Sequence, residues 1–186
     1  MKADPTQFFR TTILVHESAK HSLDPDDKGN WHGGELVGSK YGVTGDKLAE
    51  YRRVKRVTLA DMAALTEQEA IDLGLHFFYN KCGVALLPWD EVIASVVDFG
   101  YNTGLERAVK VLQVLIGAQD DGQAGAKTRK AYEAWRCKHT PESAMKAWTA
   151  ARIAKYRSFN NPKYIGGWTN RANSFLPGSA WWRANA

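Results

Sequence analysis

The fold expected for this chain follows from PWDEVIASVVDFGYNTG, residues 88–104. Apolar residues occupy every side of a helix from Val92 to Phe99, yet the run is about half the length of a membrane span. A helix that is apolar all round has to be buried in a protein core. We therefore expect a central helix over about Trp89–Tyr101, ended by Asn102-Thr103-Gly104.

Segments on both sides of this stretch supply the helices that would cover it. Apolar residues recur at helical spacing from Leu105 to Ile116, and Gly117 is a typical helix stop. Cap residues and apolar spacing predict further helices that begin at Thr58, at the capping box Thr66-Glu67-Gln68-Glu69, near Lys127 and at Thr140-Pro141. The sequence thus predicts a mainly helical protein around one buried helix.

A first helix and a long polar loop precede these elements. The helix starts at the Asp4-Pro5 pair, a good cap and first residue, and its apolar face reaches about Glu17. Turn-forming residues dominate residues 18–41, which argues against a helix there. We expect a small irregular lobe, with a short strand over Lys40–Thr44 as its best β candidate.

The composition is that of an ordinary folded domain, with 186 residues of which 44% are hydrophobic and 24% charged. No internal repeat or linker divides the chain, so we expect residues 1–186 to form a single compact, monomeric unit. Within it, residues 8–87 would hold the first helix and the loop lobe. Residues 88–176 would hold the core helix and a helical segment that follows it.

Lysine and arginine exceed aspartate and glutamate by five, and the surplus lies in the last third of the chain. Lys155 and Arg157, near the end of the last long helix, are expected to be exposed. Such a surface attracts an anionic polymer, which could be a nucleic acid, an anionic membrane or the bacterial envelope. The sequence contains no nucleic-acid recognition motif and no apolar run of membrane-spanning length. MKADPTQFFRTTILVHE also lacks the features of a signal peptide, so an extracellular target would need another route.

Two cysteines and a histidine pair raise the question of disulfides and metals. Cys82 and Cys137 are far apart and form no CxxC motif, so both are expected to be free thiols. His16-Glu17 begins an HExxH-like string, but His21 follows His16 by five residues rather than four. On a helix the two rings would lie about 140° apart, against about 40° for a zinc pair. Only a loop-borne site stays open, and we expect no metal and no cofactor.

Glu17 is the residue whose position suggests chemistry. It follows Phe9 and Ile13 at four-residue steps, on the apolar side of the helix and near its C-terminal end. Apolar surroundings and the negative end of the helix dipole both raise the pKa of such a carboxyl. A carboxyl that stays protonated near neutral pH can act as general acid on a glycosidic bond. The same position also suits a glutamate that snorkels at a helix end.

Glycoside hydrolysis generally requires a second carboxylate. Asp24, Asp26 and Asp27 follow Glu17 within ten residues, on a glycine-bearing loop that can fold back over a cleft. Acidic runs also occur as plain solvated turns, and we interpret Asp27 in that way.

Four stretches of the chain carry a family pattern. They are HES with DPDDKGNW and GSKYGVT in the loop, LTEQEAIDLGLHFFYNK at 65–81, DFGYNTGLERAVKVLQVLIGAQDDGQAGAKT at 98–128, and KYRSFNNPKYIGGWTNRANSF at 155–175. In this order they resemble glycoside hydrolase family 108, phage endolysins and related bacterial N-acetylmuramidases. The resemblance covers about residues 8–176. It implies a lysozyme-like α+β fold and a peptidoglycan-binding region that includes the third stretch.

The resemblance also implies roles in the loop lobe. In the wider lysozyme superfamily an aspartate follows the catalytic glutamate by nine residues, and a hydroxyl residue comes later. Glu17 and Asp26 keep this spacing, which favours Asp26 over Asp24 as the second carboxylate. Either Ser39 or Thr44 would supply the hydroxyl that positions water.

Three departures from the family pattern lie in the same lobe. The two glycines after the family's glutamate are Ser18 and Ala19 here, the loop is longer around Trp31–Gly38, and Ser39 replaces a threonine. Residues expected either to line the sugar cleft or to pack near it are Tyr41, Tyr101, Asn102, Trp168, Asn170 and Arg171.

These features predict a lysozyme-type glycosidase that cleaves the bond between N-acetylmuramic acid and N-acetylglucosamine in bacterial peptidoglycan. Without a signal peptide, it would stay in the host cytoplasm until another protein opens the membrane at lysis. Two alternatives remain from other classes. A non-catalytic peptidoglycan-binding protein would not depend on Glu17, and a nucleic-acid-binding protein would use the basic surplus instead.

Overall fold

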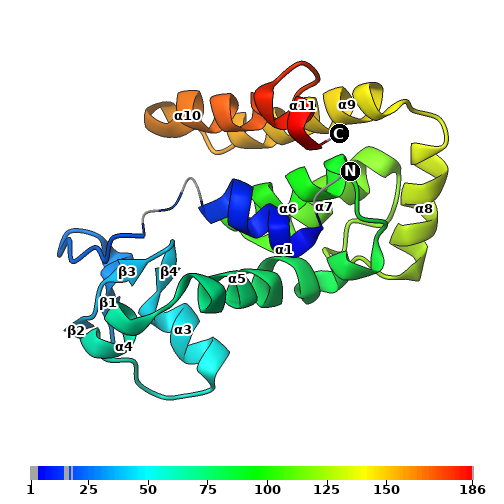
Figure 1. Ribbon diagram of the computed structural model, residues 1–186. Helices are drawn as coiled ribbons and strands as arrows, with labels where there is room; N and C mark the ends of the chain where they lie inside the picture. The colour runs from blue at the N-terminus through cyan, green and yellow to red at the C-terminus, as the bar shows by residue number, and fades with distance from the viewer. Residues whose placement is uncertain (1–3, 15–16, 18, 186) are drawn as a thin grey trace. The chain divides into compact units, whose positions relative to one another are not determined.

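The computed structural model describes residues 4–14, 17 and 19–185. Its mainly helical architecture confirms the predicted fold class, because helices carry the core and the strands form two small antiparallel pairs (Figure 1). Contacts along the chain define two compact units, Thr6–His76 and Met1–Pro5 with Phe77–Ala186. Whether the two unfold together is a separate question, so the predicted single unit stays a prediction.

The first helix begins where the Asp4-Pro5 pair predicts. α1 (Pro5–Phe8) continues into a π-helical turn, η1 (Phe9–Ile13), and Phe8, Phe9 and Ile13 are fully buried. Gly74 in α5 (Glu67–Leu75) lets the helices approach, because a Cβ there would lie 2.6 Å from the ring of Phe9. Close packing of α5 on η1 thus forms the core of the unit Thr6–His76.

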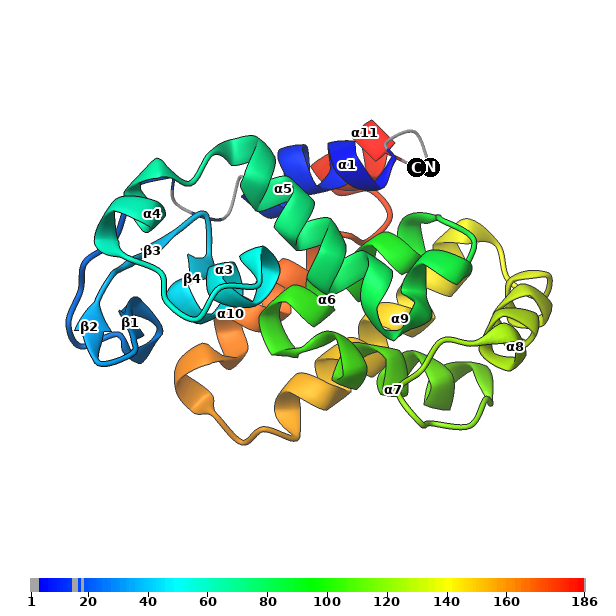
Figure 2. The same cartoon turned by 90° about the horizontal axis from the view of Figure 1, so that it is seen from below.

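Two short hairpins form the β part of this unit (Figure 2). β1 (Trp31–His32) pairs with β2 (Glu35–Leu36), and β3 (Ser39–Lys40) pairs with β4 (Val43–Thr44). β structure within the predicted range Lys40–Thr44 is confirmed, but the range spans the turn and parts of both strands of a hairpin rather than one strand. The chain reverses at Tyr41 and the glycine after it, which have φ values of 53° and 70°. Positive φ at both loop positions is what a two-residue hairpin requires.

Threonine caps start the three helices that follow the hairpins. Thr44, Thr58 and Thr66 cap α3 (Gly45–Arg52), α4 (Leu59–Ala64) and α5. The Thr58 box is reciprocal, since Asp61 bonds back to the Thr58 backbone. The box predicted at Thr66 is only half formed, because the carboxylate of Glu69 instead pairs with Arg52 on α3 at 2.8 Å.

The buried central helix is confirmed in the unit Phe77–Ala186. α6 (Glu91–Thr103) is buried from Glu91 to Gly100 and ends at Gly104. It starts two residues later than predicted, because the Asp90 side chain accepts hydrogen bonds from the backbone of Val92 and Ile93 and so caps the helix. A cap of this kind fixes the first turn.

The helices that cover α6 follow the predicted order. α7 and α9 pack on α6, α8 packs on α7, and α10 packs on α9 (Figure 1). Their bounds are α7 Leu105–Ile116, α8 Ala126–Arg136, α9 Pro141–Arg157, α10 Pro162–Asn173 and α11 Ala180–Asn185. The last two helices were not predicted, since Gly166-Gly167 weakens the helical pattern of α10.

Candidate active site

Glu17 lies three residues beyond Leu14, just after the end of the described helix. Its backbone N–H donates to the Leu14 carbonyl at 3.1 Å, and the residue is half-buried. Val15, His16 and Ser18 lie outside the described residues, so the predictions made for His16 and Ser18 cannot be compared with the structure. The position agrees with a glutamate that follows a buried apolar helix face.

Backbone pairing brings the segment after Glu17 to the second hairpin. Ser22, five residues further on, exchanges both backbone hydrogen bonds with Ser39 of β3, at 2.8 and 3.0 Å. This bridge fixes the segment after Glu17 to strand β3, so Ser39 belongs to the same small lobe as that segment.

His21 secures this closure by a side-chain contact. Its Nε2 lies 2.7 Å from the carbonyl oxygen of Val37. Gly38, with a φ of +82°, packs against the same ring, and a Cβ at this position would overlap His21 and the Ser22 carbonyl. His21 thus has a structural partner within the loop lobe.

Ser39 and Thr44 face each other as cross-strand partners. Directly opposed residues place their side chains on the same face of a hairpin. The Thr44 hydroxyl accepts the Lys47 N–H as the cap of α3, at 3.4 Å. Within the described part of the chain, the Ser39 side chain makes no hydrogen bond. The two candidate hydroxyls therefore differ, since one is used as a helix cap.

The three aspartates of the loop have different environments. Asp24 accepts the backbone N–H of Asp26 at 2.9 Å, and Asp27 accepts that of Gly29 at 2.8 Å. The turn role expected for Asp27 is confirmed, and Asp24 shares it. The Asp26 carboxylate is exposed and has no hydrogen bond to another described residue. The turn lies beside the hairpin, because a Cβ on Gly29 would lie 3.3 Å from the methyl group of Thr44.

Asn30 organises the loop, a role that the sequence-based reasoning missed. Its side chain is fully buried, and the side-chain amide donates to the backbone carbonyl of Asp24 at 2.9 Å. The backbone carbonyl of Asn30 accepts the N–H groups of Val37 and Gly38. The Trp31 indole N–H donates to the Pro25 carbonyl at 2.9 Å. An asparagine and a tryptophan next to the acidic run were the available signal.

His32 and the two cysteines were the other possible metal ligands or reactive groups near or outside the lobe. His32 Nδ1 lies 2.6 Å from the Asp46 carboxylate. Cys82 and Cys137 are free thiols, as predicted, and burial raises the pKa of Cys82. Across residues 4–14, 17 and 19–185, no cluster of three acidic, histidine or cysteine side chains could hold a metal ion.

Five of the predicted cleft residues belong to the other unit, Phe77–Ala186, whereas Tyr41 is half-buried at the β3–β4 turn. Tyr101 packs on Phe78 with ring centroids 4.7 Å apart, and Trp168 stacks on Tyr156 at 5.2 Å. Asn102 and Asn170 are exposed near these rings in sequence, on α6 and α10. A cleft role for the five stays a prediction.

Arg171, the fifth of them, takes part in a buried ion cluster. Its guanidinium donates to Asp98 at 2.9 and 3.0 Å, and Arg152 binds the same carboxylate at 2.5 Å. Burial opposes ionisation, but the two arginines outweigh it and hold the pKa of Asp98 below its ordinary value. Asp98 therefore has a structural role, because its carboxylate joins two arginines of the helices that pack on α6 and α9.

Two family models match the chain in succession. Residues 10–104 match the model described as glycosyl hydrolase 108, which covers just over half of the chain and includes α6. Residues 107–173 match a predicted peptidoglycan domain, which begins within α7. The catalytic-type and wall-binding segments implied by the sequence motifs both have a counterpart here.

A solved structure supports the same relationship over nearly the whole chain. The structure of Brucella abortus SagA is 27% identical, with a TM-score of 0.70, and the match covers 91% of this chain and 90% of that one. The comparison with curated proteins gave no match.

Proposed function

Since this chain belongs to glycosyl hydrolase family 108, we propose that it cleaves the bond between N-acetylmuramic acid and N-acetylglucosamine in bacterial peptidoglycan. A peptidoglycan-binding domain follows the hydrolase match in the same chain, which supports this substrate. The formal net charge of +5 also suits an anionic wall.

The proposed acid is Glu17 and the proposed second carboxylate is Asp26. Glu17 would protonate the leaving oxygen, and Asp26 would activate water or stabilise positive charge on the sugar. The observation that carries this assignment is the contrast among the three aspartates. Asp24 and Asp27 are used by backbone turns, whereas the Asp26 carboxylate points to solvent without a described partner.

Ser39 is the better candidate for the hydroxyl that positions water. Thr44 already caps α3, while the Ser39 hydroxyl is available in the described structure. Both residues sit on one face of the hairpin, beside the turn that bears Asp26. Water held there would lie in the same lobe as the second carboxylate.

The biological setting follows the phage-type resemblance and is also a proposal. The protein would act as a monomeric endolysin that waits in the host cytoplasm and reaches the wall when another protein opens the membrane. Within the described residues, no helix is long and apolar enough to cross a bilayer.

Product analysis on purified peptidoglycan tests the proposed reaction. We expect soluble fragments that carry N-acetylmuramic acid at the new reducing end, identified by reduction and mass spectrometry. N-acetylglucosamine at that end would show that the other glycosidic bond is cut. If the protein sediments with the wall but releases no new reducing ends, it is a non-catalytic binding protein. If it shifts the mobility of duplex DNA, the nucleic-acid-binding alternative is favoured.

A further inference from the structure

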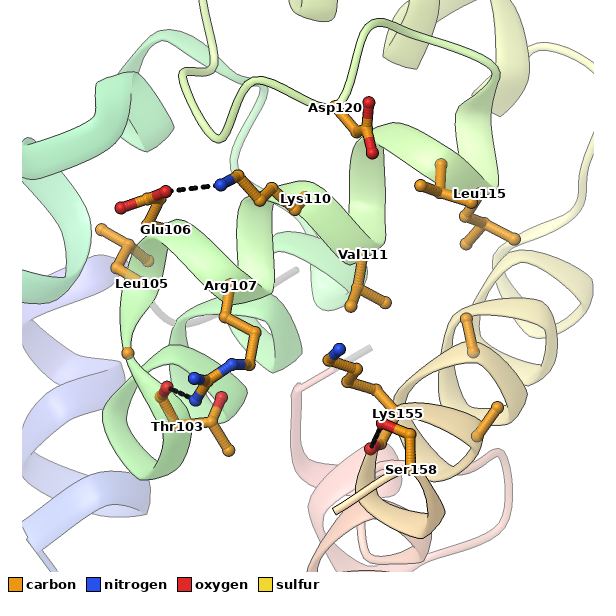
Figure 3. A pocket seen from close by; sticks show the side chains of 14 residues that line it. Thr103, Leu105, Glu106, Arg107, Lys110, Val111, Leu115, Asp120, Lys155 and Ser158 are labelled. Carbon is orange, nitrogen blue, oxygen red and sulfur yellow. Dashed lines mark hydrogen bonds and ion pairs between the residues drawn. The ribbon is translucent and has the colours of Figure 1, made fainter.

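A groove of about 930 Å³ lies between α7 and α9, within the unit Phe77–Ala186 (Figure 3). Its volume is near the upper end of the range for sites that hold small ligands, about 300–1,000 Å³. Most of its lining residues fall inside residues 107–173, the match to the peptidoglycan domain. Neither the motifs nor the family matches assign a role to this groove.

The floor of the groove is aliphatic. Val111, Val114 and Leu115 line it from α7, and the small side chains of Ala151 and Ala154 leave room on the α9 side. Val114 is 66% exposed, which leaves an apolar side chain uncovered inside a concave surface. Uncovered apolar surface of this kind is typical of a ligand contact.

Two cations that form no ion pair with a described carboxylate lie at one end of the floor. Figure 3 shows the Lys155 side chain directed into the groove, towards Arg107 and Val111. Arg107 and Lys155 lie over the Phe159 ring at 5.3 and 5.7 Å, and neither forms an ion pair with any residue that the structure describes. Lys110, in contrast, pairs with Glu106 at 2.6 Å.

The lining chemistry favours a peptide over a glycan or a nucleic acid. None of the 14 lining side chains is aromatic, so the groove offers no ring on which a sugar or a base could stack. Glu106 and Asp120 also line it, so the negative groups of a ligand have to lie at Arg107 and Lys155. A short chain with few carboxylates meets this condition, whereas a continuous phosphate backbone does not. The aliphatic floor and the two cations, Arg107 and Lys155, together fit a short chain with methyl groups and carboxylates.

We propose that this groove binds the stem peptide of peptidoglycan. Its carboxylates would bind Arg107 and Lys155, and its alanyl methyl groups would lie on the floor near Ala154 and Val114. The proposal rests on the proposed function only in taking peptidoglycan as the partner. It gives the wall-binding domain a peptide site that is separate from the cleavage chemistry in the loop lobe.

Calorimetric titration of the full chain with stem peptide tests the site. The peptide is released from purified wall by an amidase, and a peptide-free N-acetylglucosamine oligomer serves as the comparison ligand. Lys155→Glu should weaken peptide binding at least about tenfold, the size expected for loss of a charged hydrogen bond. Arg157→Glu is the matched control, because Arg157 is exposed on the same helix outside the groove, and it should stay within about twofold of wild type.

A second variant separates the site from general charge. Ala154→Phe fills the groove without changing its charge and should also weaken peptide binding about tenfold or more. Unfolding midpoints equal to that of wild type would show that the variants fold. The proposal is overturned if the wild-type chain does not bind the peptide, or if Lys155→Glu and Arg157→Glu weaken peptide binding equally. It is also overturned if Ala154→Phe leaves peptide binding unchanged.

The glycan comparison keeps the two proposals apart. Oligomer binding that Ala154→Phe abolishes would assign the groove to the glycan and overturn the peptide site. If the protein cleaves peptide-free glycan but does not bind the peptide, the groove assignment is wrong and the proposed reaction is unaffected. Peptide binding without any cleavage would contradict the proposed reaction and leave the groove assignment intact.

Discussion

Arg171 on α10 donates three hydrogen bonds to the carboxylate of Asp98 on α6, although 73 residues separate them in the chain. Arg152 on α9 binds the same carboxylate, so one buried negative charge joins three helices. Both Asp98 and Arg152 are fully buried. A buried charge is tolerated when it is paired and hydrogen-bonded, and this cluster therefore depends on all its members.

Asp98→Asn should lower the free energy of unfolding by about 3–5 kcal/mol at neutral pH, because Arg152 is left buried without its counter-charge. The pKa of Asp98 is lowered in the folded state, so its stabilising effect is complete above the unfolded value of about 3.9. It is lost progressively as the pH falls from there through the native pKa. Urea denaturation of wild type and variant between pH 7 and pH 2 should show the difference narrowing in acid.

Exposed Asp120 provides the matched control for that experiment. Asp120→Asn should change the free energy of unfolding by no more than about 0.5 kcal/mol. A wild-type-like Asp98→Asn, or a difference that does not narrow in acid, would show that the buried cluster does not stabilise the folded chain.

In the aspartate run, we expect Asp26 to be required for activity, and Asp24 and Asp27 to contribute mainly to stability. Asp26→Ala is expected to lower glycan cleavage by about 100-fold or more with an unchanged melting temperature. Asp24→Ala and Asp27→Ala each remove a turn hydrogen bond and should cost about 0.5–1.5 kcal/mol of stability, with the smaller loss of activity. Reducing-end release and thermal unfolding measure the two effects, and an activity loss centred on Asp24 would move the assignment.

Of the two hydroxyl residues, Ser39 should affect activity and Thr44 should affect stability. Ser39→Ala is expected to leave stability unchanged and to slow cleavage by about 10- to 100-fold through misplaced water. Thr44→Val should cost about 0.5–2 kcal/mol of stability, because α3 loses its cap. Thr44→Ser keeps the cap and is the control. Full activity in Ser39→Ala would exclude a role for this hydroxyl.

Most helices could be predicted because their signals are local. The apolar pattern of α6 and the stop at Gly117 lie within a few residues of the structure they determine. Two local predictions, the strand over Lys40–Thr44 and the start of the central helix, differ from the structure for identifiable reasons. Tyr41 adopts a positive φ that a tyrosine seldom takes, which concealed the hairpin turn. Asp90 caps α6, so the helix begins at Glu91 and not at Trp89 as predicted.

The site was predictable only where sequence spacing carries the information. The nine-residue interval from Glu17 to Asp26 is visible in the sequence, but the backbone bonds that engage Asp24 are not. Arg171 was expected at the sugar cleft, and its bond to Asp98 depends on how distant helices pack. Lys155 was expected to be exposed, yet it is half-buried in the groove, because helical spacing alone does not show which face α7 meets.

Cleavage of purified peptidoglycan by the variant Glu17→Gln tests whether Glu17 is the catalytic acid. Glutamine keeps the shape of the side chain but has no acidic proton to donate. Exposed Glu67, in the same unit, provides the control variant Glu67→Gln, which should match wild type. We expect Glu17→Gln to lose about 100-fold or more of the reducing-end release, with wall binding and unfolding midpoint unchanged. Retention of more than about a tenth of wild-type release would contradict it.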